Sequence, residues 1–527
     1  MKKCKKIISL LLALLMALSV FTIVPFTASA AEAELIGTGE QDGFYNYTIL
    51  ADGSAEITKY FGTDDHVVVP ATLGGHTVTV IGQSAFSGSE DMTSVDIPNT
   101  VTCIKLLAFS DCTGLTSITV PDSVTIIDDS VFENCINLAE INLPDTLTYL
   151  GAYVCSNTKW SNNQPAGSIV YLGNYAYRYE YDWYSEPPED LVLREGTIGI
   201  ADYAFRESDK YKSITLPDSL RFIGEDAFIN CYNVKKINFG NSITEIQRMA
   251  FKGCDSLTNI TFPDSLTRIG ENAFYYCSKL GIINIPDSVV SIGEDAFEGT
   301  AWYDGQPDET LVYAGKVAYS YKGRNMPGEI ILKPDTLGIA DSAFESFIHT
   351  NKIILPNSLK HIGARAFKLC RAETGGIPDS VTSIGEAAFV SSSFPESVTI
   401  PKSVKRIEDY AFGYYGSGVS YLKDDDFTIY GYSGTDAERY AKENGFKFND
   451  LSAQSPVILG DADGDGEVTI LDATAIQRHI AELPTQSFNK TAADADEDGE
   501  VTILDATSIQ RHIAELPTNK NIGKPVK

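Results

Sequence analysis

Hydrophobic and polar positions repeat with a fixed period from about residue 77 to residue 413. Phenylalanines mark this period, and within each group the step is 23 residues, except for 22 between Phe367 and Phe389. Self-similarity at such a period predicts a solenoid, in which stacked units bury a face that one unit cannot bury alone. The marked positions are Phe86, Phe109 and Phe132; Phe205, Phe228, Phe251, Phe274 and Phe297; and Phe344, Phe367, Phe389 and Phe412.

Each unit carries the pattern of a short strand. In residues 115–121, LTSITVP, we expect Ile118 and Val120 to point inward, and Pro121 to end the strand. The I-G-x-x-A-F segment that follows supplies a second apolar ridge, with alanine where the coil has to be thin. The expected outward positions are small and polar, which suits a polysaccharide or a protein ligand equally: Ser117, Thr119, Asn142, Thr215, Asn238, Thr261 and Asn284.

A complete unit, residues 265–287, reads SLTRIGENAFYYCSKLGIINIPD. It resembles the BspA-like class of bacterial surface leucine-rich repeats, whose units read S-V-T-x-I-G-x-x-A-F-x-x-C-x-x-L-x-x-I-x-I-P. Twelve Phe-marked units carry this resemblance over roughly two thirds of the chain. It implies an α+β repeat protein with a curved right-handed solenoid, and a role in adhesion or ligand binding rather than catalysis.

The cysteines follow the same period. Cys112 and Cys135 are 23 residues apart, as are Cys231, Cys254 and Cys277. Equal spacing places these thiols at one buried slot of successive coils, where cysteine serves as a small apolar residue. Disulfides remain the alternative interpretation for a secreted chain.

Two insertions, at about 157–195 and 300–335, interrupt the array and resemble each other. The first is rich in aromatic residues, of which Tyr179, Tyr181, Trp183 and Tyr184 are candidates for stacking on sugar rings. The alternative is that alternating tyrosines form a hairpin packed on the solenoid, and recurrence of the insertion favours this alternative. The pairs that correspond are Trp160 and Trp302, Gln164 and Gln306, Pro165 and Pro307, Val170 and Val312, Tyr171 and Tyr313, and Tyr177 and Tyr319.

Both ends of the array depart from the repeat, as the caps of a solenoid do. Residues 31–76 predict short strands broken at Gly53 and Gly74. Near residue 448, where the solenoid region 77–448 ends, we expect a strand and then a helix capped by Ser433 or Thr435 and ending at Gly445.

The N-terminal residues 1–30 have the layout of a secretory signal, with basic residues, an apolar run and a cleavage site before Ala31. Its removal would take four lysines, Lys2, Lys3, Lys5 and Lys6, and change the formal charge from −30 to −34. Such a polyanion should be repelled by nucleic acid and anionic membranes. No later apolar run is long enough to span a bilayer. We therefore expect an extracellular protein.

After a linker at 449–457, an acidic loop and helix occur twice. The spacing in each loop is that of a calcium site, because it places carboxylates around one point and a glycine at the sharp turn. We therefore expect two Ca²⁺ ions. The predicted ligands are Asp461, Asp463, Asp465, Asp472 and the carbonyl of Glu467 in the first loop, and Asp494, Asp496, Asp498, Asp505 and the carbonyl of Glu500 in the second.

A standard EF-hand has an entering helix and a glutamate at loop position 12, and both are missing here. The duplicated loop and exiting helix, at 458–518, instead resemble a type I dockerin domain, and residues 519–527 read as a tail. This resemblance implies a cohesin module of a scaffoldin as partner, and attachment to a cellulosome or cell surface. The positions that read the partner in dockerins fall on Ile470, Leu471, Gln477, Arg478, Ile503, Leu504, Gln510 and Arg511.

Four of these eight residues are apolar, which indicates a hydrophobic interface, although Ile470, Leu471, Ile503 and Leu504 could instead belong to the core. Helix periodicity predicts that other apolar residues pack the two halves together: Ile476, Ile480 and Leu483 against Ile509, Ile513 and Leu516.

The sequence favours a non-catalytic protein, because its histidines are scattered or belong to the duplication and no nucleophile elbow, H-E-x-x-H or P-loop is present. The alternatives are a polysaccharide-degrading enzyme with an unrecognised active site, and a structural spacer. Regular coils leave little chain for the substrate cleft that an enzyme needs.

Overall fold

The computed structural model describes residues 40–526, except 51, 181–186, 394–395, 417–419, 453–456, 465, 482 and 484–487. The predicted signal at 1–30 therefore lies outside the described residues. The chain forms two compact units, one of residues 1–394 and 406–424 and the other of residues 395–405 and 425–527. Among the described residues, no helix has the length and apolar character needed to cross a membrane.

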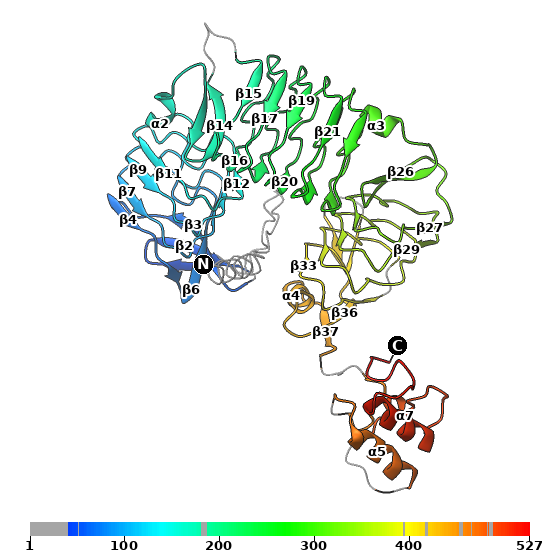
Figure 1. Cartoon of the computed structure of the whole chain (residues 1–527). Coiled ribbons are helices and arrows are strands. Elements are labelled where there is room, and N and C mark those ends of the chain that lie inside the picture. The colour runs from blue at the N-terminus through cyan, green and yellow to red at the C-terminus, as the bar shows by residue number, and fades with distance from the viewer. Residues whose placement is uncertain are drawn as a thin grey trace, which may run out of the picture. The chain divides into compact units, whose positions relative to one another are not determined.

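The first unit is a stack of coils, and most coils carry one three-residue strand and one two-residue strand (Figure 1). Both kinds of strand pair in parallel with their equivalents one coil away, as Ser117 does with Glu140 and Ile126 with Tyr149. The predicted solenoid of about 23-residue coils is thus confirmed.

In the coils, the three-residue strands are β4 (His66–Val68), β7 (Ser94–Asp96), β9 (Ser117–Thr119), β11 (Glu140–Asn142), β15 (Asp190–Val192), β17 (Ser213–Thr215), β19 (Lys236–Asn238), β21 (Asn259–Thr261), β23 (Ile282–Asn284), β27 (Glu329–Ile331) and β29 (Lys352–Ile354), and the second unit contains β32 (Ser397–Thr399). The two-residue strands are β8 (Cys103–Ile104), β10 (Ile126–Ile127), β12 (Tyr149–Leu150), β16 (Gly199–Ile200), β18 (Phe222–Ile223), β20 (Glu245–Ile246), β22 (Arg268–Ile269), β24 (Ser291–Ile292), β28 (Gly338–Ile339), β30 (His361–Ile362), β31 (Ser383–Ile384) and β33 (Arg406–Ile407).

The core of the solenoid is built from the repeated apolar positions. On β9, Ile118 is 2% exposed while Ser117 and Thr119 face solvent, as the alternation predicts. The marking phenylalanines form ladders in which neighbouring rings are nearly parallel and their centroids lie 4.9–5.8 Å apart. Close coils also explain the glycine of the motif, since a Cβ on Gly270 would lie 2.6 Å from the backbone nitrogen of Arg248.

The cysteines occupy the predicted slot. All eight described cysteines are free thiols, and Cys112, Cys135, Cys231, Cys254 and Cys277 are each 0% exposed. In each of these five, the thiol donates a hydrogen bond to the backbone carbonyl of a phenylalanine 26 residues earlier. The structure thus supports the thiol interpretation over disulfides.

Both insertions form the same structure, a one-turn helix followed by a hairpin. The first comprises α2 (Lys159–Asn162), β13 (Ser168–Leu172) and β14 (Tyr175–Glu180). The second comprises α3 (Ala301–Asp304), β25 (Thr310–Ala314) and β26 (Val317–Lys322). Because β14 pairs with β16 and β26 with β28, each hairpin extends the sheet of two-residue strands.

The hairpin interpretation of the tyrosines is therefore correct for those described. Tyr179 lies on β14 and is only 5% exposed, so it offers no ring face to a sugar, and its assignment as a stacking residue was wrong. Tyr181, Trp183 and Tyr184 lie outside the described residues.

Short strands lie at both ends of the array, and a helix follows at its C-terminal end. At the start, β1 (Glu40–Asp42), β2 (Tyr45–Ile49), β3 (Ala55–Tyr60) and β6 (His76–Ile81) join one sheet, and β5 (Thr72–Leu73) pairs with β6. At the end of the array, β34 (Tyr414–Tyr415) pairs with β35 (Leu422–Lys423). In the second unit, β36 (Thr428–Gly431) lies between β32 and β37 (Lys447–Asp450), and α4 (Asp436–Glu443) begins after Thr435.

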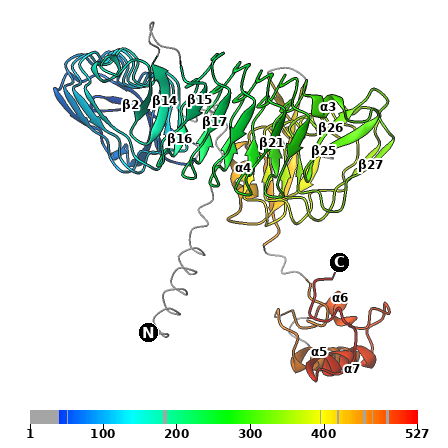
Figure 2. The same ribbon diagram turned by 45° about the horizontal axis from the view of Figure 1, so that its top comes forward.

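The last domain is helical. It contains α5 (Ile470–Ile480), α6 (Lys490–Ala493) and α7 (Ile503–Ile513), and α5 and α7 lie side by side (Figure 2). Ile476 and Ile509 are both 0% exposed, as predicted for packing between the halves. The other residues assigned to that packing are exposed by 43–54%, so their assignment was wrong: Ile480, Leu483, Ile513 and Leu516.

Candidate calcium and partner-binding site

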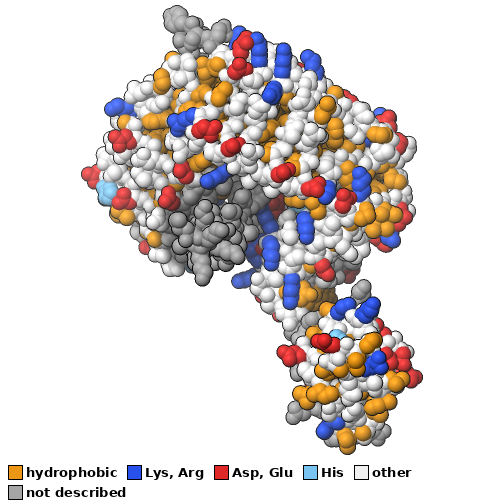
Figure 3. All heavy atoms as spheres, in the orientation of Figure 1, with side chains coloured by type: hydrophobic (Ala, Val, Ile, Leu, Met, Phe, Trp, Pro, Cys, Tyr) orange, Lys and Arg blue, Asp and Glu red, His pale blue; other side chains and the backbone are white. Residues whose placement is uncertain are grey.

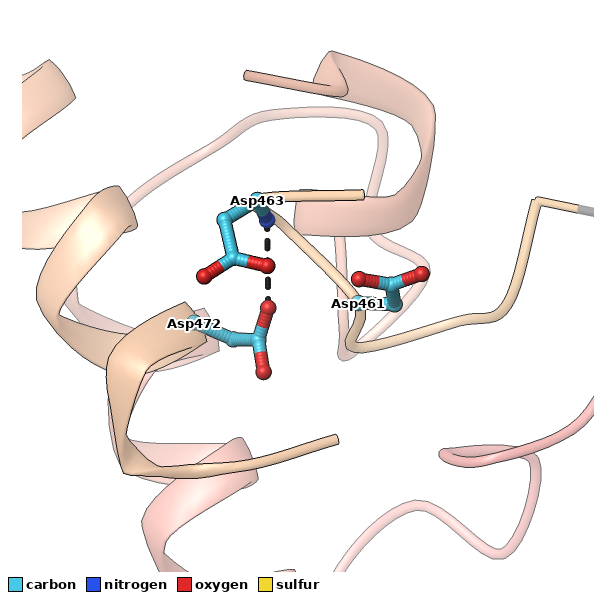
Figure 4. Close-up of side chains that lie close together, drawn as sticks. All are labelled: Asp461, Asp463 and Asp472. Atoms are coloured by element: carbon cyan, nitrogen blue, oxygen red, sulfur yellow. Dashed lines mark hydrogen bonds between the residues drawn. The ribbon is translucent and has the colours of Figure 1, made fainter. Parts of the chain in front are cut away.

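The first acidic loop brings three of its predicted carboxylates together. Asp461, Asp463 and Asp472 each place an oxygen within 4.8 Å of the others (Figure 4). The Asp461 carboxylate is held by the backbone amides of Gly464 and Gly466, at 2.9 and 3.0 Å. The fourth predicted carboxylate, Asp465, lies outside the described residues. The loop is thus already folded around a point that carboxylates surround.

Asp472 explains why this loop ends in aspartate rather than glutamate. It is the third residue of α5, and its carboxylate accepts a hydrogen bond of 2.7 Å from the amide of Thr469, which caps the helix. Its other oxygen accepts from the amide of Asp463 at 3.1 Å. The short side chain therefore caps the helix and faces the carboxylate cluster at once.

The second loop repeats this geometry. Asp494, Asp496 and Asp505 form the equivalent cluster, and Asp505 caps α7 by accepting from the amide of Thr502 at 2.7 Å. The Asp494 carboxylate accepts from the amides of Asp498 and Gly499, both at 3.0 Å. The carboxylate of Asp498 lies in the described part of the loop but outside the three-residue cluster.

The residues present fit a hard cation. Oδ1 of Asp496 is buried, and in the described part of the chain it has no hydrogen-bond partner. Burial, reinforced by the charges of Asp505 and Asp498, raises the pKa of Asp496. Burial also raises the pKa of Asp472, with Asp463 and Asp461 acting in the same direction. A divalent cation would supply the missing partner and remove the repulsion, which is the environment that calcium finds in such loops.

The predicted partner-reading residues form an outward surface on the helices. Ile470 and Leu471 are 54% and 59% exposed, and their equivalents Ile503 and Leu504 are 53% and 58% exposed, which excludes the core alternative. The remaining four, Gln477, Arg478, Gln510 and Arg511, are also exposed. Figure 3 shows hydrophobic side chains gathered on the surface of this domain.

Sequence reasoning missed the segment that follows the second helix. Residues 519–526, predicted as a tail, return to the start of the domain, where Ile458 and Pro525 form an antiparallel bridge. Ile522 is 3% exposed and belongs to the core of this domain. Ile522 and Val526 in a mostly polar segment were the signal available, and two apolar residues are too few to predict packing.

On the solenoid, the expected outward residues form short ladders along the three-residue strands. The amide of Asn142 donates to Thr119 at 3.3 Å, and that of Asn238 donates to Thr215 at 3.2 Å. Asn284 donates to Thr261 at 3.0 Å. These pairs form local polar ladders, and exposed apolar side chains such as Val192, Ile282 and Ile331 lie on strands of the same kind.

Two protein families match the chain. The family described as "BspA type Leucine rich repeat region" matches residues 72–184, 180–304 and 317–424 in six copies. The family described as "Dockerin type I domain" matches residues 459–514. No curated protein matches this chain.

Solved structures of leucine-rich repeat proteins are also similar. A leucine-rich cell surface protein from Faecalibacterium prausnitzii has 26% identity, with 50% of this chain and 93% of that chain covered and a TM-score of 0.24. A leucine-rich repeat protein from Bacteroides ovatus has 24% identity, with 78% and 99% covered and a TM-score of 0.24.

Proposed function

This chain belongs to the BspA type leucine-rich repeat family and ends in a type I dockerin domain, and we propose that it is a secreted, non-catalytic binding protein that a scaffoldin cohesin module anchors. The solenoid recognises an extracellular ligand, a polysaccharide or a protein. The dockerin binds two Ca²⁺ ions and incorporates the chain into a cellulosome or a cell-surface complex. The proposed dockerin includes residues 519–526, because Ile522 belongs to its core.

The observation that best supports an anchoring role is the exposure of large apolar side chains at the start of both helices. Ile470, Leu471, Ile503 and Leu504 are each more than half exposed. Leaving a large aliphatic side chain in water rather than burying it costs roughly 1.5–3 kcal/mol. Clustered exposure of this kind is typical of a surface that a partner covers. Ile480, Leu483, Ile513 and Leu516 extend the apolar surface of this domain.

The duplication supports two equivalent docking faces. Residues 466–485 and 499–518 differ only at Ala475, which is Ser508 in the second copy. Calcium ligation needs the aspartates and the glycine, so it does not account for a repeated helix surface. We infer that one cohesin docks in either of two orientations related by about a half turn.

Recombinant type I cohesin modules test the anchoring role directly. Isothermal titration calorimetry with the full chain should give tight 1:1 binding in calcium and none in excess chelator. Binding that persists in chelator would contradict the metal dependence, and a chain that binds no cohesin in calcium would contradict the proposal.

The solenoid ligand needs a separate test, with a chain truncated after residue 457. Pull-down against plant cell-wall polysaccharides and surface proteins identifies the ligand class, and an assay for reducing sugar or proteolysis tests the enzyme alternative. A solenoid that binds neither class would favour the spacer alternative. Among the sugar-stacking candidates, Tyr181, Trp183 and Tyr184 remain a prediction, tested by changing Trp183 and Tyr184 to alanine.

A further inference from the structure

The C-terminal segment, residues 519–526, closes the dockerin domain although it lies beyond the matched residues 459–514. The amide of Leu459 donates to the carbonyl of Lys524 at 2.9 Å, and Gly523 donates to Leu459 at 2.8 Å. The segment also reaches the second acidic loop, so it connects the entry of the first loop with the second.

The contact with the second loop is made through Glu497. This residue occupies loop position 4 and has a φ of +62°, in the left-handed region. Its equivalent in the first loop is Gly464, with a φ of +78°. Glycine adopts this region readily, whereas a residue with a Cβ adopts it at a steric cost. Unlike Gly464, Glu497 brings a side chain to this loop position, and that side chain has a structural role.

That role is visible in two hydrogen bonds. One carboxylate oxygen of Glu497 accepts from the side-chain amide of Asn519 at 3.0 Å and from that of Asn521 at 2.9 Å. The Asn519 amide also donates to the carbonyl of Ala495 at 2.9 Å, and its oxygen accepts from the amide nitrogen of Asn521 at 3.0 Å. Glu497, Asn519 and Asn521 therefore form a compact latch between the loop and the C-terminal segment.

We propose that this latch holds the second calcium loop in its closed form and so sets the calcium affinity of that loop. The inference rests on the proposed binding of a second ion. In the absence of metal, the carboxylates of Asp494, Asp496 and Asp505 repel one another and favour an open loop. A contact that holds the loop closed lowers the cost of assembling the ligands, which is preorganisation. Glu497 is thus a positioning residue and not a ligand.

The test is a calcium titration of the full chain by calorimetry, comparing wild type with the double variant Asn519→Ala and Asn521→Ala. We expect the affinity of one of two sites to fall about tenfold, because the variant removes both hydrogen bonds to the Glu497 carboxylate. Hydrogen exchange at limiting calcium should show faster exchange in residues 494–505 and unchanged exchange in 461–472. Glu497→Gln, which keeps an acceptor, should lose less affinity.

Lys520→Ala is the matched control, because Lys520 is exposed and lies between the two asparagines; it should leave both sites unchanged. Unchanged affinity in the double variant would overturn the latch. Equal weakening of both loops would also overturn it, since that result indicates general destabilisation. A wild-type chain that binds a single ion would refute the second site itself, a result distinct from two ions with unchanged affinity.

Discussion

The phenol of Tyr149 donates a hydrogen bond of 2.7 Å to the carboxylate of Asp202, which lies 53 residues later in the chain. The two residues belong to coils on either side of the first insertion. The amide of Asp202 also donates to the carbonyl of Leu150 at 3.2 Å. These contacts continue the coil stack across the insertion.

The first prediction concerns the pH dependence of this junction. Asp202 is 6% exposed, and burial raises its pKa well above the ordinary value of 3.8. A carboxyl with a raised folded pKa contributes stability that is present below the unfolded pKa and lost as the pH rises through the folded pKa. Asp202→Asn should therefore raise the melting temperature of the solenoid by a few degrees at pH 8. It should change little near pH 4, and calorimetric melts at both values provide the measurement.

Asp190→Asn is the control, because Asp190 is an exposed aspartate on β15 and should keep the wild-type profile. A pH profile in Asp202→Asn that matches wild type would contradict the prediction.

The second prediction concerns the phenylalanine ladder. Phe251 is 0% exposed, and its ring lies 5.1 Å from that of Phe228 and 5.3 Å from that of Phe274. Phe251→Ala should lower the free energy of unfolding by about 3–5 kcal/mol, because it leaves a cavity between two coils. Urea denaturation followed by circular dichroism measures this loss. Tyr232→Ala, at a 48% exposed position, should cost less than about 1 kcal/mol.

The solenoid was predictable because its signal is repeated. One alternation at Ile118 and Val120 would be weak evidence for a strand, but twelve marked coils make the period unambiguous. Tyr179 was harder to place, because alternating tyrosines suit both an exposed stacking platform and a packed hairpin. Only the pairing of β13 with β14 and of β14 with β16 shows that its ring is covered.

In the dockerin, the cation loops were predictable because ligand chemistry fixes both residue type and spacing. The packing of the helix ends could not be predicted in this way. Helix periodicity places Ile480 on the side of α5 that holds buried Ile476, yet Ile480 is 44% exposed. Whether an apolar residue at a helix end is covered depends on where the neighbouring helix ends, and periodicity carries no information about that.

The third prediction is that the dockerin folds with its metal. Its core is a small separate cluster that includes Leu459, Ile476, Ile509 and Ile522. Without calcium, the carboxylates of both loops repel one another, so excess chelator should remove most of the helical circular dichroism of residues 457–527. Calcium should restore the signal, and magnesium at the same concentration serves as the control. A spectrum unchanged by chelation would show that the domain folds without metal.

The fourth prediction distinguishes a dockerin that binds cohesin through two equivalent faces from one that uses a single face. If the two faces are equivalent, replacing Ile470, Leu471, Gln477 and Arg478 together with alanine removes one of two orientations. The loss of one of two equal modes reduces affinity by about twofold, which corresponds to about 0.4 kcal/mol. Replacing the equivalent set in the second half alone should have the same small effect: Ile503, Leu504, Gln510 and Arg511.

Changing both sets should reduce cohesin affinity by about a thousandfold or more, because every apolar anchor is then lost. Calorimetric titration with a cohesin module measures all three variants, and circular dichroism in calcium confirms that each one is folded. Lys490→Ala, at an exposed position on α6, should behave as wild type. If the first set alone abolished binding and the second set alone had no effect, the cohesin would use a single face. The repeated helix surface would then need another explanation.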